Sequence, residues 1–161
     1  MTTTQALVID DSRAMRLILG DLLQQLGYET TEAGDGQQAI TLLEGDDTIP
    51  TLALVDWNMP VMNGLEFIRA VRQKHCYSDM KLLVVTSEAE VGQMVEALTA
   101  GADEYLMKPF SSEALACKLE MMGLQRAERA LESSERNESI ERRALLSSPG
   151  LSWAALGALL Q

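Results

Sequence analysis

The sequence lacks most of the features that mark a membrane, secreted or metal-thiolate protein. No run of about eighteen apolar residues occurs, which argues against a transmembrane helix. Residues 1–5 show no basic segment followed by an apolar run, so no secretory signal is visible. Cys76 and Cys117 have no metal-ligand spacing, and we expect buried or inert thiols; the single histidine, His75, is interpreted as a surface residue. These absences predict a cytoplasmic protein.

Positive charge is also scarce, and its distribution divides the chain into two parts. Residues 1–123 contain 19 acidic and 8 basic side chains and so carry the whole net charge of −11. Residues 124–161 contain five arginines and five glutamates and are neutral. Proteins bind nucleic acids largely by neutralising phosphates. An acidic body without a basic face therefore argues against nucleic-acid binding.

Apolar residues make up 47% of the chain, and their spacing alternates between short strand-like runs and longer helical patterns. The expected strands are residues 5–9, 28–33, 51–55, 81–86 and 104–107. A helical pattern follows each strand: 12–27, from 35 or 36 to 45, 65–74, about 91–101, and from 111 or 112 onward. Parallel strands need such crossover connections. We therefore predict an α/β fold with a doubly wound, five-stranded parallel sheet.

Reactive side chains stand at the carboxyl ends of four of these strands. Asp10 and Asp11 follow the first strand, and Asp56 follows the third. Thr86 ends the fourth strand, and Lys108 follows the fifth. Each residue alone has an ordinary explanation, such as a helix N-cap or a turn. Ligands of parallel sheets bind beyond these strand ends, however, so the combination favours one functional site.

The residue types suit phosphoryl transfer. Three converging carboxylates would repel one another and raise each other's pKa values. A bound Mg²⁺ would remove this conflict, because the ion prefers a few carboxylates together with water and phosphate oxygens. Lys108 and Thr86 could contact phosphoryl oxygens. The pattern predicts that Asp56 is a carboxylate nucleophile in a site that acts by positioning and charge neutralisation.

Several segments together resemble the receiver domains of two-component response regulators, with the greatest likeness to chemotaxis regulators of the CheY type. The segments are Val8–Arg13, Asp56–Gly64, Val84–Ser87, Ala100–Tyr105 and Lys108–Phe110. The likeness covers about residues 5–123. It implies a flavodoxin-like or CheY-like fold, with a receiver domain at 1–123 and a C-terminal extension at 124–161.

The resemblance also implies a role for each acidic residue. Asp56 would accept a phosphoryl group from a phosphohistidine of a sensor histidine kinase or a histidine phosphotransfer protein. Asp11 would bind Mg²⁺ directly, Asp10 would assist through a water molecule, and Asn58 would supply its backbone carbonyl. The chain would then catalyse only its own phosphorylation and dephosphorylation and would not be an enzyme. A Mg²⁺-dependent phosphohydrolase would need a second acid where Asn58 stands.

A switch is implied by the same resemblance. Lys108 and Thr86 would contact phosphoryl oxygens, and Pro109 would follow a cis peptide bond. Movement of Thr86 would be coupled to Tyr105, whose alternative interpretation is a partly exposed strand aromatic. Such a two-state element would alter the surface of residues 90–123, through which we expect a downstream protein target to bind.

Two polar residues are expected to set the lifetime of the phosphorylated state. Asn58 lies two residues after Asp56, and Glu88 lies two residues after Thr86. Both should border the path of an attacking water, and the pair resembles that of short-lived regulators. We therefore expect relatively fast self-dephosphorylation.

Two functions are compatible with these features. The leading prediction is a stand-alone switch that acts by phosphorylation-dependent protein binding, and the resemblance implies a role in chemotaxis or motility. In that case a chemotaxis histidine kinase would be the donor and the flagellar motor switch would be the target. The alternative is a phosphoryl carrier or sink in a multistep phosphorelay, which onward transfer from Asp56 would reveal.

The C-terminal extension indicates less. Residues 124–146 are rich in Glu, Arg and Ser and favour either a solvated helix or a linker. Residues 151–160 form a short apolar segment that contains Trp153 and could not span a membrane. This segment could pack on the receiver, dock a partner or mediate self-association.

Overall fold

The computed structural model describes residues 4–87 and 90–124, which form a parallel sheet with the strand order β2-β1-β3-β4-β5. The strands are β1 (Thr4–Ile9), β2 (Tyr28–Ala33), β3 (Leu52–Val55), β4 (Lys81–Thr86) and β5 (Glu104–Met107). The helices are α1 (Arg13–Gln25), α2 (Gly36–Gly45), α3 (Gly64–Arg72), α4 (Val91–Ala100) and α5 (Ser112–Met121), with a 3-10 turn η1 (His75–Tyr77).

This architecture confirms the predicted doubly wound sheet, and its elements follow the predicted order. Several element ends differ by one or two residues. Strand β1 begins at Thr4 and β3 at Leu52, α1 spans Arg13–Gln25 rather than 12–27, and α3 spans Gly64–Arg72 rather than 65–74. These ends depend on tertiary pairing, which local apolar patterns do not encode. The predictions for the C-terminal extension beyond Leu124 lie outside the described residues.

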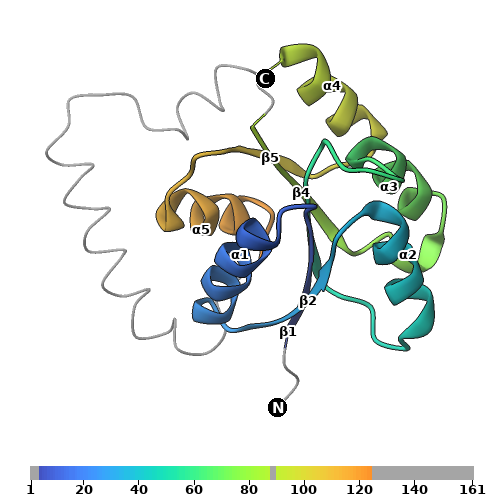
Figure 1. The fold of residues 1–161 in the computed structure, drawn as a ribbon, viewed down its shortest axis with the longest axis horizontal. Coiled ribbons are helices and arrows are strands. Elements are labelled where there is room, and N and C mark those ends of the chain that lie inside the picture. The colour runs from blue at the N-terminus through green and yellow to red at the C-terminus, as the bar shows by residue number, and fades with distance from the viewer. Residues whose placement is uncertain (1–3, 88–89, 125–161) are drawn as a thin grey trace, which may run out of the picture. The chain divides into compact units, whose positions relative to one another are not determined.

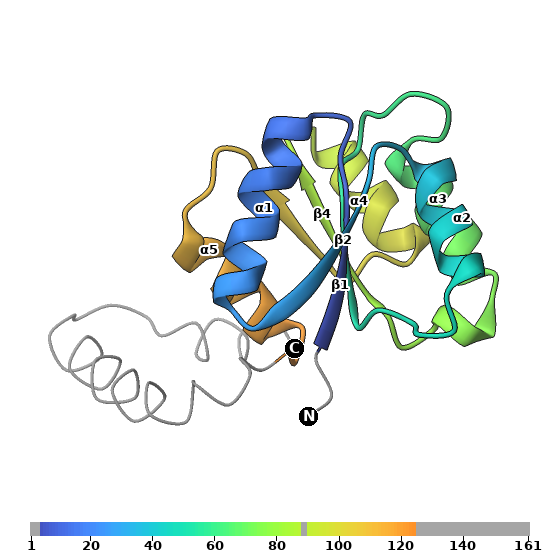
Figure 2. The same ribbon diagram turned by 60° about the horizontal axis from the view of Figure 1, so that its bottom comes forward.

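The helices cover both faces of the sheet. Helices α1 and α5 lie on one face, and α2, α3 and α4 lie on the other (Figure 1, Figure 2). Alternate residues of a strand enter opposite cores. In β1, Leu7 and Ile9 belong to the core that includes α3, whereas Ala6 and Val8 belong to the core that includes α1 and α5. Burial of both faces explains why these strands are continuous apolar runs rather than alternating ones.

Side-chain caps fix where four of the helices begin. Ser12 accepts from Met15 N–H before α1, and Asp35 accepts from Gln38 N–H before α2. Two further caps are Asn63, which forms a reciprocal capping box with Glu66 before α3, and Ser111, which precedes α5. Each cap satisfies a backbone N–H that the helix itself leaves without a partner. The caps therefore hold the loops that leave the carboxyl ends of the strands.

Arg72, the last residue of α3, holds together several loops on the opposite edge of the sheet. Its guanidinium donates to the backbone oxygens of Tyr77 and Met80, each at 2.9 Å. The same group donates to the Gly101 oxygen and to the Asp103 carboxylate, again at 2.9 Å. Gly101 has a φ of 121°, and a Cβ at this position would overlap Cγ of Arg72. These contacts, the Arg72 clamp, fix the turn between α4 and β5.

We expect the substitution Arg72→Lys to lower the free energy of unfolding by about 2–4 kcal/mol, measured by urea denaturation. A lysine cannot reproduce the planar set of donors, and each buried carbonyl left without a donor costs about 1–3 kcal/mol. The matched control is Arg69→Lys, one turn earlier on α3, where an exposed arginine makes a 3.8 Å pair with Glu96. It should change stability by less than about 0.5 kcal/mol. Equal effects of the two variants would contradict the role of the clamp.

Candidate functional site

The candidate site lies at the carboxyl ends of β1 and β3. At this point the order in which strands are added to the sheet changes from one side of β1 to the other. Strand β1 is flanked by β2 on one side and β3 on the other, so successive crossovers leave toward opposite sides. Open α/β sheets bind ligands at such a switch point. The two strands stay paired up to the site, because Asp56 N–H donates to the Ile9 oxygen at 2.9 Å.

Three carboxylates meet at this point. One oxygen from each of Asp10, Asp11 and Asp56 lies within 4.8 Å of the others. Asp10 is 1% exposed and Asp56 is 9% exposed, whereas Asp11 is open to solvent. The structure therefore brings together the three acids that the sequence placed at two strand ends. Asp10 and Asp56 are buried, and Asp11 is exposed to solvent.

Asp10 is held at four of its atoms. Its N–H donates to the Ala33 oxygen at 3.1 Å, and its own backbone oxygen accepts from Arg16 Nη1 at 2.6 Å. Its carboxylate accepts from Ser12 N–H at 2.8 Å and from Lys108 Nζ at 2.7 Å. A buried charge is tolerated when it is paired and hydrogen-bonded in this way. Asp10 is therefore a fixed negative charge in the site.

Lys108 reaches the carboxylates from the far side of β4. Its Nζ lies 2.7 Å from Asp10 Oδ2 and 3.7 Å from Asp56 Oδ2. Its backbone N–H donates to the Thr86 oxygen at 2.9 Å, which extends the pairing of β4 with β5. The peptide bond between Lys108 and Pro109 is cis, as predicted. The ammonium group thus sits between two acids, with its stem fixed by the sheet.

The carboxyl group of Asp56 is destabilised in its charged form. Burial, and next the negative charge of Asp10, raise the pKa of Asp56 from 3.8 to about 6. Lys108 and the N–H of Trp57, which donates to Asp56 Oδ1 at 2.8 Å, act in the opposite direction. Asp11 adds a smaller repulsion. A further cation at the site would relieve this repulsion.

The donor set fits a hard divalent metal ion. Three carboxylates face one ammonium group, so two negative charges remain uncompensated within the cluster. Oxygen ligands from a few carboxylates, with room for water, are what Mg²⁺ requires. The exposed carboxylate of Asp11 leaves one side of the cluster open to solvent. The described residues are therefore compatible with metal binding at this cluster.

Two glycines shape the loop that follows Asp56. Gly64 donates its N–H to the Trp57 oxygen at 2.9 Å, and a Cβ at this position would overlap the backbone oxygen of Asp56. Gly36 donates its N–H to the Met62 oxygen at 3.1 Å and has no room for a Cβ beside Met62. The sequence marks Gly64 only as a loop residue. Its position at the start of α3, where glycine is a poor helix former, was the available signal of a close backbone approach.

The other predicted residues occupy different environments. Thr86 is buried at the end of β4, and Asn58 is exposed in the loop after Asp56. Tyr105 is 5% exposed, so its alternative interpretation as a partly exposed aromatic is wrong. It packs in the core that also contains Ala97 of α4. Coupling of Thr86 to Tyr105 stays a prediction, and so does the dephosphorylation role, for which Glu88 lies outside the described residues.

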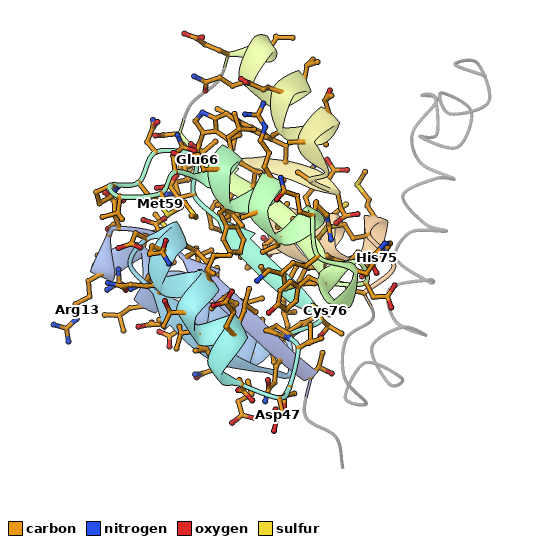
Figure 3. The ribbon with its side chains drawn as sticks, turned by 90° about the vertical axis from the view of Figure 1, so that its right-hand side faces the viewer. Arg13, Asp47, Met59, Glu66, His75 and Cys76 are labelled. Carbon is orange, nitrogen blue, oxygen red and sulfur yellow. The ribbon has the colours of Figure 1, made fainter. Side chains whose placement is uncertain are left out.

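The remaining residues singled out in the sequence lie away from the site. His75 is exposed on η1, as expected, and Figure 3 shows it with Cys76 far from Met59 of the site loop. Cys76 and Cys117 are both exposed free cysteines, so of the expected buried or inert thiols the buried alternative is wrong and the inert one stays a prediction. Among the residues that the structure describes, no helix combines the length and apolar character needed to cross a membrane.

Comparisons with known proteins agree with this geometry. The response regulator receiver domain model matches residues 6–120. A chemotaxis protein CheY homologue of Campylobacter jejuni is 42% identical over 115 residues, which cover 71% of this chain and 88% of the relative. The chemotaxis protein CheY of Pseudomonas aeruginosa is 39% identical over 71% of this chain and 91% of its own length. The structure of the chemotaxis response regulator CheY4 of Vibrio cholerae superposes with a TM-score of 0.69 at 34% identity, covering 75% of this chain and 99% of that chain.

We predict that Asp56→Asn stabilises the protein at pH 8 in Mg²⁺-free buffer, by about 1–3 kcal/mol in urea denaturation. The folded-state pKa of about 6 lies above the ordinary 3.8, so ionisation of Asp56 destabilises the fold. This cost is fully present above pH 6 and disappears as the pH falls toward 4. The gain from Asp56→Asn should therefore vanish near pH 4. It should also shrink when Mg²⁺ is added, and a gain independent of pH would contradict the raised pKa.

Proposed function

Because the chain belongs to the response regulator receiver domain family, we propose that Asp56 accepts a phosphoryl group from a phosphohistidine on a partner protein. The observation that carries the proposal is the position of Asp56, buried at the switch point between Asp10 and Lys108. The donor would be a sensor histidine kinase or a histidine phosphotransfer protein. The chain would signal by binding a target protein when phosphorylated, and the chemotaxis relatives favour a chemotaxis pathway.

The carboxylates would serve two purposes in this reaction. Asp10, Asp11 and Asp56, with the backbone carbonyl of Asn58, would hold Mg²⁺. When bound, the ion neutralises negative charge on the carboxylates and on the phosphoryl oxygens. Asp56 is the acceptor because it is the acid at the centre of the sheet with a raised pKa. With a pKa of about 6 it remains mostly ionised at neutral pH, so it can act as a nucleophile.

Phosphoryl transfer exchanges one bond for another. A carboxylate oxygen of Asp56 attacks the phosphorus, the P–N bond to the histidine breaks, and its electron pair stays on the imidazole. Lys108 Nζ, which is 3.7 Å from Asp56 Oδ2, would pair with a phosphoryl oxygen. The Thr86 hydroxyl at the end of β4 would donate to another. These roles require positioning rather than acid–base chemistry, which matches a site held by backbone contacts.

The surface of α4, β5 and α5, within residues 90–123, is the proposed binding face for the downstream target. Three apolar residues of α4 are exposed there: Val91 by 73%, Val95 by 57% and Leu98 by 47%. Exposed apolar residues that share a helix face often mark a protein interface. Tyr105 lies in the core that packs against α4, so a change at the site could be transmitted to this face through β5.

We predict that the intact mass of the chain increases by one phosphoryl group after incubation with Mg²⁺ and a phosphorylated histidine kinase domain. Asp56→Asn should abolish the increase, and so should a chelator. The control is Asp47→Asn, since Asp47 is an exposed acid far from Met59 of the site loop (Figure 3) and should leave the reaction unchanged. Phosphorylation of Asp56→Asn would refute the assignment. Onward transfer to a phosphotransfer protein, faster than hydrolysis, would favour the carrier alternative.

A second prediction concerns the binding face. In the phosphorylated state, Val95→Glu should weaken binding to a fragment of the cognate flagellar switch protein by at least roughly tenfold, because it places a charge within an apolar interface. Phosphorylation of Asp56 should be unaffected. Leu42→Glu is the control, because Leu42 is a partly exposed leucine on α2 and lies outside the proposed face. Calorimetry measures both affinities, and an equal loss in the two variants would contradict this choice of face.

A further inference from the structure

We propose that Arg16 is a positioning residue that sets the affinity of the acidic cluster for Mg²⁺ by fixing the peptide group between Asp10 and Asp11. This inference rests on the proposed function, since it takes Mg²⁺ as the ion that these carboxylates hold. Arg16 itself carries no ligand atom for a metal ion. It would act through the backbone of the two acids.

The first support is the hydrogen bond that ends β1. Asp10 is the first residue after β1, and the preceding Ile9 oxygen accepts from Asp56 N–H. The Asp10 oxygen instead accepts from Arg16 Nη1 at 2.6 Å. A backbone carbonyl at a buried strand end needs such a partner. Arg16 thus supplies the hydrogen-bond donor for the Asp10 oxygen, whereas a neighbouring strand end supplies the donor for the Ile9 oxygen.

Fixing this carbonyl also fixes Asp11. The carbonyl of Asp10 and the N–H of Asp11 belong to one planar peptide group, so the position of one sets the orientation of the other. Within the described part of the chain, the Asp11 carboxylate has no hydrogen bond or ion pair of its own. The Cα of Asp11, from which its side chain leaves, is therefore positioned by the peptide group that Arg16 holds.

The guanidinium of Arg16 is itself held in place. Its Nε lies 3.8 Å from Glu32 Oε2 on β2, and its side chain is largely buried. A planar group with several fixed donors can meet two partners in this way, whereas a lysine ammonium would meet one of them.

Arg16 contacts the cluster at the backbone oxygen of Asp10 rather than at a carboxylate. The charges that shift the pKa of Asp56 are those of Asp10, Lys108 and Asp11, and Arg16 is not among them. Nor does Arg16 stabilise its helix, because a cation near a helix N-terminus opposes the helix dipole. Helix α1 has no acidic residue in its first turn that would offset this cost. The contacts with the Asp10 carbonyl and with Glu32 account for the position of its side chain.

The test is the Mg²⁺ affinity of Arg16→Lys and Arg16→Gln, read from Trp57 fluorescence. Trp57 is a suitable probe because its N–H donates to Asp56 Oδ1, and a Trp153→Phe background leaves it as the sole tryptophan. We expect the dissociation constant for Mg²⁺ to rise roughly tenfold in both variants, as when residues that orient metal ligands are replaced. The phosphorylation rate at saturating Mg²⁺ should stay within about twofold of wild type.

Arg13→Gln is the matched control. Arg13 begins the same helix, loses the same charge on substitution, and points away from the body of the protein (Figure 3). Its Mg²⁺ affinity should equal that of wild type. Unchanged affinity in both Arg16 variants would overturn the inference, and so would an equal loss in Arg13→Gln. Urea denaturation without Mg²⁺ shows whether each variant folds. If Arg16→Gln does not fold, the Mg²⁺ affinity of Arg16→Lys tests the inference. A wild-type protein that binds no Mg²⁺ would instead refute the proposed function.

Discussion

The mutual repulsion of three carboxylates at one edge of a buried sheet is the constraint on which the rest of the structure depends. Asp10 and Asp56 are removed from water by two strands whose faces are both covered, which raises the cost of their charge. The protein offsets part of that cost by the Lys108 ammonium and by backbone N–H groups. The remaining excess of negative charge makes the site compatible with a bound cation, and burial keeps the Asp56 carboxylate poorly solvated.

Much of the fold could be predicted from the sequence, because its main signals are local. Buried parallel strands appear as short apolar runs, and Ser12 and Asp35 are the N-caps of α1 and α2. The acidic site was predictable because the ends of parallel strands share one edge. The contact of Arg16 with the Asp10 oxygen and the close approach of Gly64 to the Asp56 oxygen could not be predicted. Each depends on the path of the backbone in a neighbouring loop, which residue types do not encode.

Helix α4 shows how far apolar periodicity can be interpreted. The spacing of Val91, Met94, Val95 and Leu98 predicts a helix correctly. Val91, Val95 and Leu98 are nevertheless exposed, and Ala97 is the fully buried residue of α4. A repeat of this kind usually identifies the face toward the core. Met94 is partly buried and packs against the same core as Ala97, whereas Val91, Val95 and Leu98 remain exposed. The burial of Tyr105 could not be predicted from the sequence around β5 either, because the residues of the core that cover it come from distant segments of the chain.

The Arg72 clamp also limits how α4 could move. The guanidinium grips the backbone at Gly101, directly after the last turn of α4, and ties it to the turn that leads into β4. Among the described residues, the first turn of α4 has no such clamp, and its N-cap Glu90 makes no side-chain capping hydrogen bond. A displacement that began near the site would therefore swing the helix about its carboxyl end. The residues nearest Val91, at the end of α4 opposite the clamp, would then be displaced furthest.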